Sequence, residues 1–205
     1  MAKIKLTKNE QKIQKDALKM YQRYLPTLTL KKQQLQTEIR AIDAKAREVR
    51  DARKALEKEF DEWIAVFADA ESFGRDTVRV SNIRKGTGNI AGVKIPIYEG
   101  ADFTRAEYDL YETPVWIDMA ADRMERALEL DLEAEVLDEQ VRLLSKELRT
   151  TTQRVNLFEK VKIPEAKENI RKISVFLGDE RVAAVVRSKI SKRKLEACLL
   201  YTSPS

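Results

Sequence analysis

Apolar residues recur at alternating steps of three and four along two long stretches of the chain, residues 7–70 and 115–190. This spacing gives each helix one apolar stripe, as in the seam of a coiled coil. The segment 71–114 between them holds five of the six glycines. The pattern predicts an all-α fold in which the N- and C-terminal helices form a long antiparallel two-stranded coiled coil, with a small β-hairpin-containing knob at the turn.

The first stretch has a clear beginning and a nearly continuous seam. Thr7 and Glu10 fit a capping box, in which a hydroxyl and a carboxylate bind exposed amides of the first turn. One of the two seam positions is interrupted by Lys32 and Arg53. Because buried charges are costly, we expect these two side chains to reach water or to pair across the seam. The other seam position is apolar throughout and holds Tyr21, Leu28, Leu35, Ile42, Val49, Leu56 and Trp63.

The second stretch contains a slip in its periodicity. Its first seam runs through Leu130, Ala134, Leu137, Val141, Leu144, Leu148, Thr151, Val155 and Phe158. A later seam is out of step with the first by one residue and is formed by Ala166, Ile170, Ile173 and Leu177. Pro164 lies at the slip. Because proline removes a helical hydrogen bond, the sequence predicts a bend or a pliable joint there.

The middle segment has the composition of a β-hairpin. Residues 76–80 and 89–95 are rich in β-branched side chains, and residues 85–89 (Lys-Gly-Thr-Gly-Asn) offer turn chemistry between them. The sequence therefore predicts two strands joined at residues 85–89. A hairpin alone is barely stable in water, so this one must pack either on the coiled coil or on another protein.

Charge is distributed unevenly along the chain, whose net charge is +5. Residues 1–60 carry sixteen Lys and Arg against eight Asp and Glu, and residues 151–195 carry twelve against five. Acidic residues predominate by ten to six in 61–114 and by ten to five in 115–150. In an antiparallel hairpin the two basic ends meet. The resulting positive tip is either a solvated surface or a nucleic-acid-binding surface.

These patterns divide the chain into four predicted segments. They are an N-terminal coiled-coil helix (1–70), a docking knob (71–114), a C-terminal coiled-coil helix (115–195) and a tail (196–205). The tail loses charge and heptad period together. We therefore expect it to be non-native.

The composition excludes several kinds of chemistry. With no histidine and only Cys198, the chain can build neither a His/Cys zinc site nor a Cys–His nucleophile. It has no Gly-rich phosphate loop. The nine carboxylates between Asp118 and Glu139 do not match the spacing of a two-metal bundle and are interpreted as a solvated face. Without an export signal or a membrane-spanning stretch, we expect a cytoplasmic protein that is not an enzyme and has no cofactor.

Three motifs resemble those of a known family. They are residues 5–10 (Lys-Leu-Thr-Lys-Asn-Glu), residues 89–99 (Asn-Ile-Ala-Gly-Val-Lys-Ile-Pro-Ile-Tyr-Glu) and residues 150–164, which include Arg154-Val-Asn-Leu-Phe-Glu159. Over residues 3–195 the chain resembles the D subunit of the V/A-type (vacuolar or archaeal type) rotary ATPases, in particular the bacterial branch. The family's usual Arg-Val-Asn-Ala-Leu-Glu differs from residues 154–159 in two apolar positions.

The resemblance implies the central rotor axle of such an ATPase. This axle carries torque between ATP hydrolysis or synthesis in a head of A and B subunits and ion translocation through a membrane ring. The implied partners are the A and B subunits, the F subunit, and the C subunit, which joins the axle to the ring. The chain would be a cytoplasmic protein at the membrane periphery, touching the membrane only through the complex and binding no nucleic acid. The resemblance leaves open whether the ion is H⁺ or Na⁺ and whether the complex runs in hydrolysis or synthesis.

Two sets of residues are expected to bind these partners. The head contact is assigned to Gln153, Arg154, Val155 and Asn156, although Arg154 could equally be an ordinary exposed helix residue. Docking on the F subunit or the lower stalk is assigned to Ile90, Val93, Lys94, Ile95, Ile97 and Tyr98, with internal packing as the alternative.

Two other classes of protein remain as alternatives. One is a helical-hairpin chaperone or a coiled-coil component of the flagellar export type. The other is a nucleic-acid binder that uses the basic tip, for which the sequence offers no base-reading motif.

Overall fold

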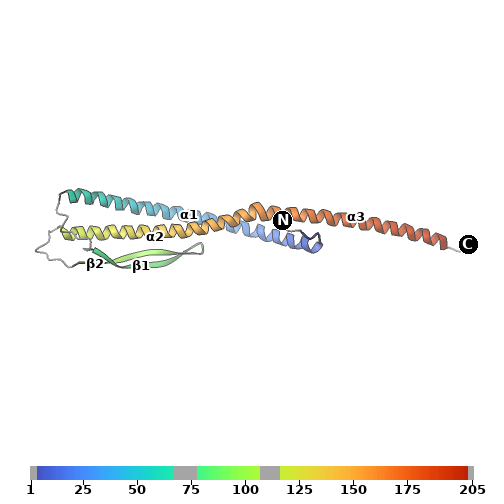
Figure 1. The fold of residues 1–205 in the computed structure, drawn as a ribbon, viewed down its shortest axis with the longest axis horizontal. Helices are drawn as coiled ribbons and strands as arrows, with labels where there is room; N and C mark the ends of the chain where they lie inside the picture. Colours follow the sequence, from blue (N-terminus) through green and yellow to red (C-terminus); the bar gives the residue numbers. More distant parts are fainter. Residues whose placement is uncertain (1–3, 67–77, 107–115, 203–205) are drawn as a thin grey trace. The chain divides into compact units, whose positions relative to one another are not determined.

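Two long helical stretches with a two-stranded sheet between them make up the computed structural model, which describes residues 4–66, 78–106 and 116–202 (Figure 1). In chain order the elements are α1 (Lys8–Val66), β1 (Val78–Ile90), β2 (Val93–Arg105), α2 (Ile117–Asn156), the π-helix η2 (Leu157–Lys162) and α3 (Ile163–Thr202). The predicted combination of long helices and a β-hairpin is confirmed. The predicted helix limits at Ala70 and Val115 lie outside the described residues.

The chain divides into two compact units, and each is described by itself. The terminal unit consists of Met1–Thr29 and Thr152–Ser205. The middle unit consists of Leu30–Thr151.

Ion pairs between α1 and α2 show that the two helices of the middle unit run antiparallel. Lys31 Nζ lies 2.7 Å from Glu147 Oε1, and Lys45 Nζ lies 2.8 Å from Glu133 Oε1. As residue numbers rise along α1, those of its partners on α2 fall. The pairing is therefore that of an antiparallel coiled coil, as the sequence predicts.

The predicted seam forms the core of this helix pair. Its completely buried members are Leu35 on α1 and Leu144 on α2, each 0% exposed. The buried residues that pack with them are Ile42, Ala46, Val49, Ile95, Leu130 and Leu137. Arg53, one of the two charges expected to interrupt the seam, is half-buried and pairs across it with Asp131 (Nε to Oδ2, 3.2 Å). The side chain of Trp63 lies outside the described part.

The hairpin is longer than predicted and turns at a different place. The 13-residue strands β1 and β2 are antiparallel and meet at Ala91 and Gly92, whose φ angles are 51° and 85°. Two consecutive positive φ angles are typical of a type I′ turn, whose twist matches that of the flanking strands. The prediction of a turn at residues 85–89 is therefore wrong, because this segment lies within β1 and pairs with residues 94–98.

The glycines that suggested a turn have another role. A Cβ added to Gly86 would collide with Glu99 Oε1, and one added to Gly88 would lie 2.8 Å from Ile97 Cδ1. Both contacts are closer than real Cβ atoms make. These two glycines thus leave space for side chains that reach across from β2.

The hairpin packs on the helix pair of the middle unit. Ile95 is 5% exposed within the core cluster, and the partly buried Ile90 and Val93 pack against the same cluster. The backbone carbonyl of Pro96 accepts a hydrogen bond from Gln140 Nε2 (2.5 Å). At the end of β2, Arg105 donates to Glu125 Oε1 (2.6 Å) on α2. Part of the hairpin therefore packs against the helices of the same unit.

In the terminal unit, too, the N-terminal and C-terminal helical stretches run antiparallel. Gln11 Nε2 donates to Ser174 Oγ (2.5 Å), and the rings of Tyr21 and Phe158 have centroids 5.1 Å apart. The first half of the predicted capping box is present, since Thr7 Oγ1 accepts a hydrogen bond from the amide of Glu10 (3.3 Å).

The slip in the second seam corresponds to the π-helix η2, which ends two residues before Pro164. The amide of Ile163 donates to the carbonyl of Phe158, five residues earlier, whereas an α-helix would use a carbonyl four residues earlier. A π turn contains one additional residue and so moves all later side chains around the helix by one position. Val155, Ala166 and Ile173 are consequently all buried although their spacing departs from the heptad.

Replacing Leu144 by Ala should lower the free energy of unfolding by about 2–5 kcal/mol, because it leaves a cavity in a fully buried site. Leu30→Ala is the matched control, since Leu30 is 56% exposed in the same unit. The control should change stability by less than about 1 kcal/mol. Urea unfolding followed by circular dichroism measures both. Equal effects of the two variants would contradict the proposed core.

Replacing Gly92 by Ala should destabilise the hairpin by about 1–2 kcal/mol, because an L side chain is strained at φ 85°. Gly178→Ala should have the opposite sign, a gain of about 0.5–1 kcal/mol, because Gly178 lies within α3 with open space around it. Amide hydrogen exchange in β1 and β2 reports the first effect and thermal unfolding the second. A stabilising Gly92→Ala would rule out the turn at Ala91–Gly92.

Candidate functional site

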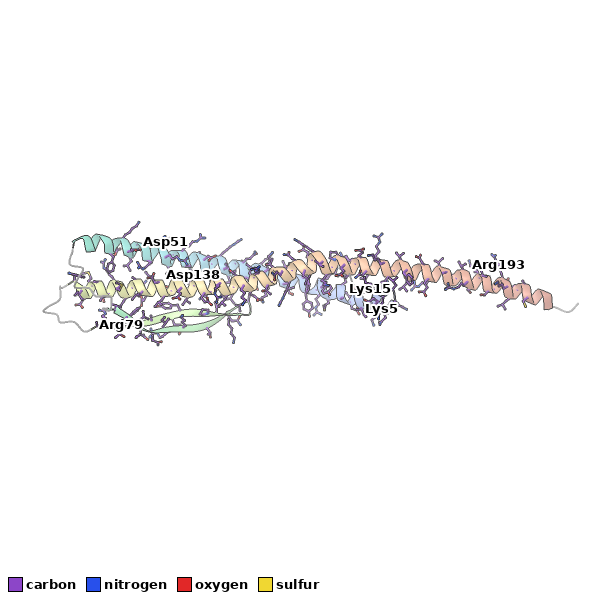
Figure 2. All side chains as sticks on the ribbon, viewed as in Figure 1. Lys5, Lys15, Asp51, Arg79, Asp138 and Arg193 are labelled. Atoms are coloured by element: carbon purple, nitrogen blue, oxygen red, sulfur yellow. The ribbon has the colours of Figure 1, made fainter. Side chains whose placement is uncertain are left out.

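The two units carry opposite net charges. The terminal unit has nineteen Lys and Arg against eight Asp and Glu, a net charge of +11. The middle unit has twenty against twenty-six, a net charge of −6. Charged side chains lie along all the long helices, among them Lys15 and Arg193 in the terminal unit and Asp51 and Asp138 in the middle unit (Figure 2). Each unit therefore offers partners a surface of a different sign.

Three of the four residues assigned to the head contact are exposed. Gln153, Arg154 and Asn156 face outward near the end of α2, whereas Val155 is only 6% exposed. Val155 belongs to the buried seam, so of the four assigned residues only its three neighbours are open to a partner. Head binding by this set stays a prediction.

The sequence reasoning did not single out two apolar residues beside that set. Leu157 and Val161, both on η2, are 44% and 48% exposed. Since they fall on neither the earlier nor the later seam, the slip in periodicity was the signal that could have identified them. Like Gln153, Arg154 and Asn156, they are open to a partner in the terminal unit.

The six hairpin residues assigned to docking divide into an inner and an outer group. Ile90, Val93 and Ile95 belong to or pack on the core of the middle unit. Lys94 is exposed, and Ile97 is 43% exposed. Of the six, Lys94 and Ile97 are thus the residues open to a partner. Partner binding there stays a prediction.

Tyr98, the last of the six, lies at a cavity of about 250 Å³ between the hairpin and the helix pair. Its hydroxyl oxygen is buried and has no hydrogen-bond partner among the described residues. Burial and the nearby carboxylates of Glu129 and Glu133 raise the pKa of this phenol above its usual value of 10.0. Tyr98 is therefore neutral at physiological pH, and its ring contributes packing.

A second cavity, of about 430 Å³, lies between the hairpin and α2. Its lining is mainly charged and consists of Lys85, Pro96, Glu135, Val136, Asp138, Glu139 and Arg142. Glu139 and Arg142 form an ion pair (2.6 Å), and this hydrogen bond lowers the pKa of the Glu139 carboxyl. The ion pair thus stabilises the charged form of Glu139, as expected for a carboxylate on a solvated surface.

The described residues contain no group of three or more carboxylate or thiol side chains that could hold a metal ion. This finding includes the acidic face from Asp118 to Glu139. In the same part of the chain, no helix has an apolar stretch of the length needed to cross a bilayer.

Comparison with known proteins gives a consistent result over nearly the whole chain. The family model for the D subunit of ATP synthase matches residues 10–193. The V-type ATP synthase D subunit of Borreliella burgdorferi is 46% identical over 195 residues, which cover 95% of this chain and 96% of the relative. Those of Chlamydia muridarum and Chlamydia pneumoniae are 36% and 35% identical, with 95% and 94% of this chain covered, and 97% and 93% of the relatives. The chain therefore belongs to the D-subunit family of the V-type ATP synthases.

Proposed function

We propose that this chain is the central rotor axle of a V/A-type rotary ATPase. It transmits torque between ATP hydrolysis or synthesis in a head of A and B subunits and ion translocation through a membrane ring. The proposal rests on one observation: the chain belongs to the D-subunit family and is built from antiparallel helix pairs. The axle itself catalyses no reaction and binds no cofactor.

The helix pair of the middle unit has the mechanical properties that an axle needs. An apolar seam closes it from within, and the ion pairs Lys31–Glu147, Lys45–Glu133 and Arg53–Asp131 join its two helices on the outside. Twisting one helix against the other would break both sets of contacts at once. Such a pair turns as one body, which is the requirement for transmitting torque.

Each unit has a surface suited to a different partner. The basic terminal unit, with Gln153, Arg154 and Asn156 exposed, is assigned to the A and B subunits of the head. The hairpin, through Lys94 and Ile97, is assigned to the F subunit or another part of the lower stalk, where the C subunit connects the axle to the membrane ring. The chain would then lie on the cytoplasmic side and reach the membrane only through the complex.

Assembly of the full chain with the A, B and F subunits encoded in the same genome tests this function. Native mass spectrometry should show one copy of the chain and one F subunit on each hexamer of A and B. Recovery of the chain alone as a stable oligomer, or with unfolded client proteins, would instead support a chaperone and refute the axle.

The hairpin assignment has a separate test in the double variant Lys94→Glu, Ile97→Ala. Both side chains are exposed, so the helix content should stay unchanged while affinity for the F subunit falls by about tenfold. Thr104→Glu is the control, because Thr104 is also exposed but lies near the other end of β2. Calorimetric titration with the F subunit measures the affinities. If the double variant binds with wild-type affinity, the F subunit does not dock on Lys94 and Ile97.

A further inference from the structure

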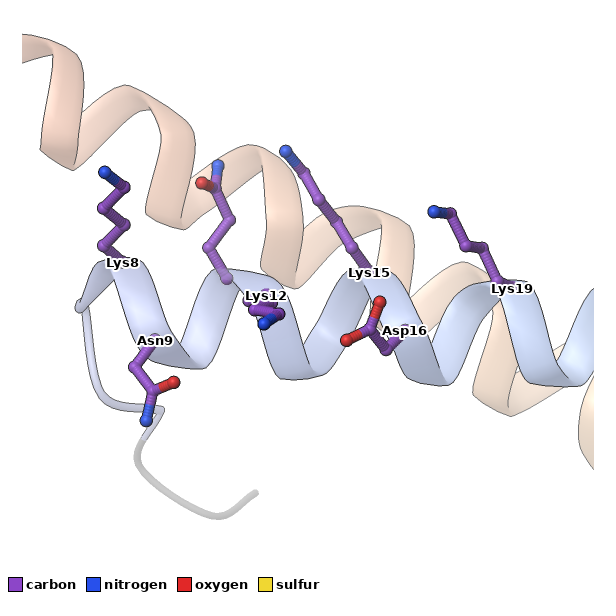
Figure 3. Close-up of a pocket in the computed structure, with 7 residues that line it drawn as sticks. Lys8, Asn9, Lys12, Lys15, Asp16 and Lys19 are labelled. Carbon is purple, nitrogen blue, oxygen red and sulfur yellow. The ribbon is translucent and has the colours of Figure 1, made fainter.

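Four lysines form a stripe on α1 in the terminal unit. Lys8, Lys12, Lys15 and Lys19 follow the spacing i, i+4, i+7 and i+11, which keeps them on one side of an α-helix. The stripe is about 16 Å long at 1.5 Å per residue. Figure 3 shows Lys8, Lys15 and Lys19 extending on the side of α1 where α3 runs, with Lys12 on the adjacent side.

None of these lysines forms an ion pair within the described part of its own unit. All four are exposed, and none has a carboxylate oxygen within 4.0 Å among the described residues. By contrast, Lys31 and Lys45, farther along the same helix, each pair with a carboxylate of α2. Like charges one turn apart repel each other, so the stripe weakens the helix that carries it.

Ion pairs in the rest of the terminal unit do not relieve this repulsion. Those among its described residues join side chains three or four positions apart on one helix: Lys162–Glu165, Lys172–Glu168 and Lys192–Glu196. The carboxylate of Glu10, on the first turn of α1, accepts a hydrogen bond from Gln14 (2.9 Å). The positive charge of the stripe thus remains available to another molecule.

The stripe lines a groove of about 700 Å³. The other lining residues are Asn9, Gln11 and Asp16. The hydrogen bond from Gln11 to Ser174 fixes α1 against α3 at this point. Four ammonium groups against the single carboxylate of Asp16 give the lining a net charge of +3, so the groove can accept a chain that carries several carboxylates.

We propose that this groove binds an acidic segment of a partner protein, with carboxylates placed along the lysine stripe. The charges are strung out over three turns of helix and do not converge on one point, which suits a ligand with several spaced charges better than a single phosphate. Its lining residues include neither an aromatic side chain for stacking on bases nor an arginine. The inference rests on the proposed function, which places the acidic segment on an A or B subunit.

The test compares two fourfold variants of the full chain. Lys8→Gln, Lys12→Gln, Lys15→Gln and Lys19→Gln together remove the charges of the stripe but keep long polar side chains. The control replaces Arg40, Arg47, Lys54 and Lys58 by Gln, because these exposed cations lie on the same helix in the middle unit and have no ion pair among the described residues. Circular dichroism verifies that both variants are folded.

Affinity for the purified A/B hexamer is measured at about 100 mM salt, where exposed charges still act over about 10 Å. The stripe variant should bind about tenfold more weakly, and its affinity should depend less on salt, while the control stays within about threefold of wild type. Carbodiimide cross-linking of the wild-type complex should join Lys12 or Lys15 to Asp or Glu side chains of an A or B subunit, identified by mass spectrometry.

The outcomes separate the two proposals. If the wild-type chain does not bind the hexamer, the axle function fails. If both variants bind as wild type does, the axle function stands and the acidic-segment inference is overturned. The inference is also overturned if the stripe variant binds the hexamer normally but loses binding to phosphatidylglycerol-rich vesicles or to inorganic polyphosphate, since the stripe would then serve a lipid or a free polyanion.

Discussion

The narrow apolar seam between α1 and α2 is the contact on which the middle unit depends. Where no third layer covers a pair of helices, a charged residue in the seam must either reach water or be paired. Leu35 and Leu144 are completely buried, and Arg53 is accommodated by pairing with Asp131. The hairpin adds a local third layer, with Ile95 in the same core and Gln140 bound to the carbonyl of Pro96. A hairpin that would be marginal alone is thereby held in place.

The same need for a continuous seam explains the π-helix in the terminal unit. An α-helix drifts relative to its partner when the apolar spacing changes, and a single inserted residue would turn all later apolar side chains toward water. Winding Leu157–Lys162 as a π-helix absorbs that residue and returns Ala166 and Ile173 to the buried side. Leu157 and Val161, within the π-helix and off both seams, are exposed. One local change in winding thus preserves the packing of the later residues.

The sequence predicted those features that depend on local periodicity. The seam, the capping hydroxyl of Thr7 and the slip near Pro164 follow from residues close together in the chain. The turn at residues 85–89 was wrong because strand register depends on contacts from outside the hairpin, such as that of Ile95 with the helix core. For the same reason the sequence could place Val155 in the seam but could not separate Ile95, which is buried, from Ile97, which is exposed.

The opposite charges of the two units give a reason for dividing the partners between them. In the middle unit, cations of α1 form ion pairs with carboxylates of α2, so these two helices are held together by charge as well as by the apolar seam. The terminal unit, at +11, lacks such matching among its described ion pairs and is held by apolar and hydrogen-bonded contacts alone. A unit of this kind gains most from an acidic partner, because binding removes repulsion already present in the free chain. Its excess charge therefore favours association with a partner over autonomous stability.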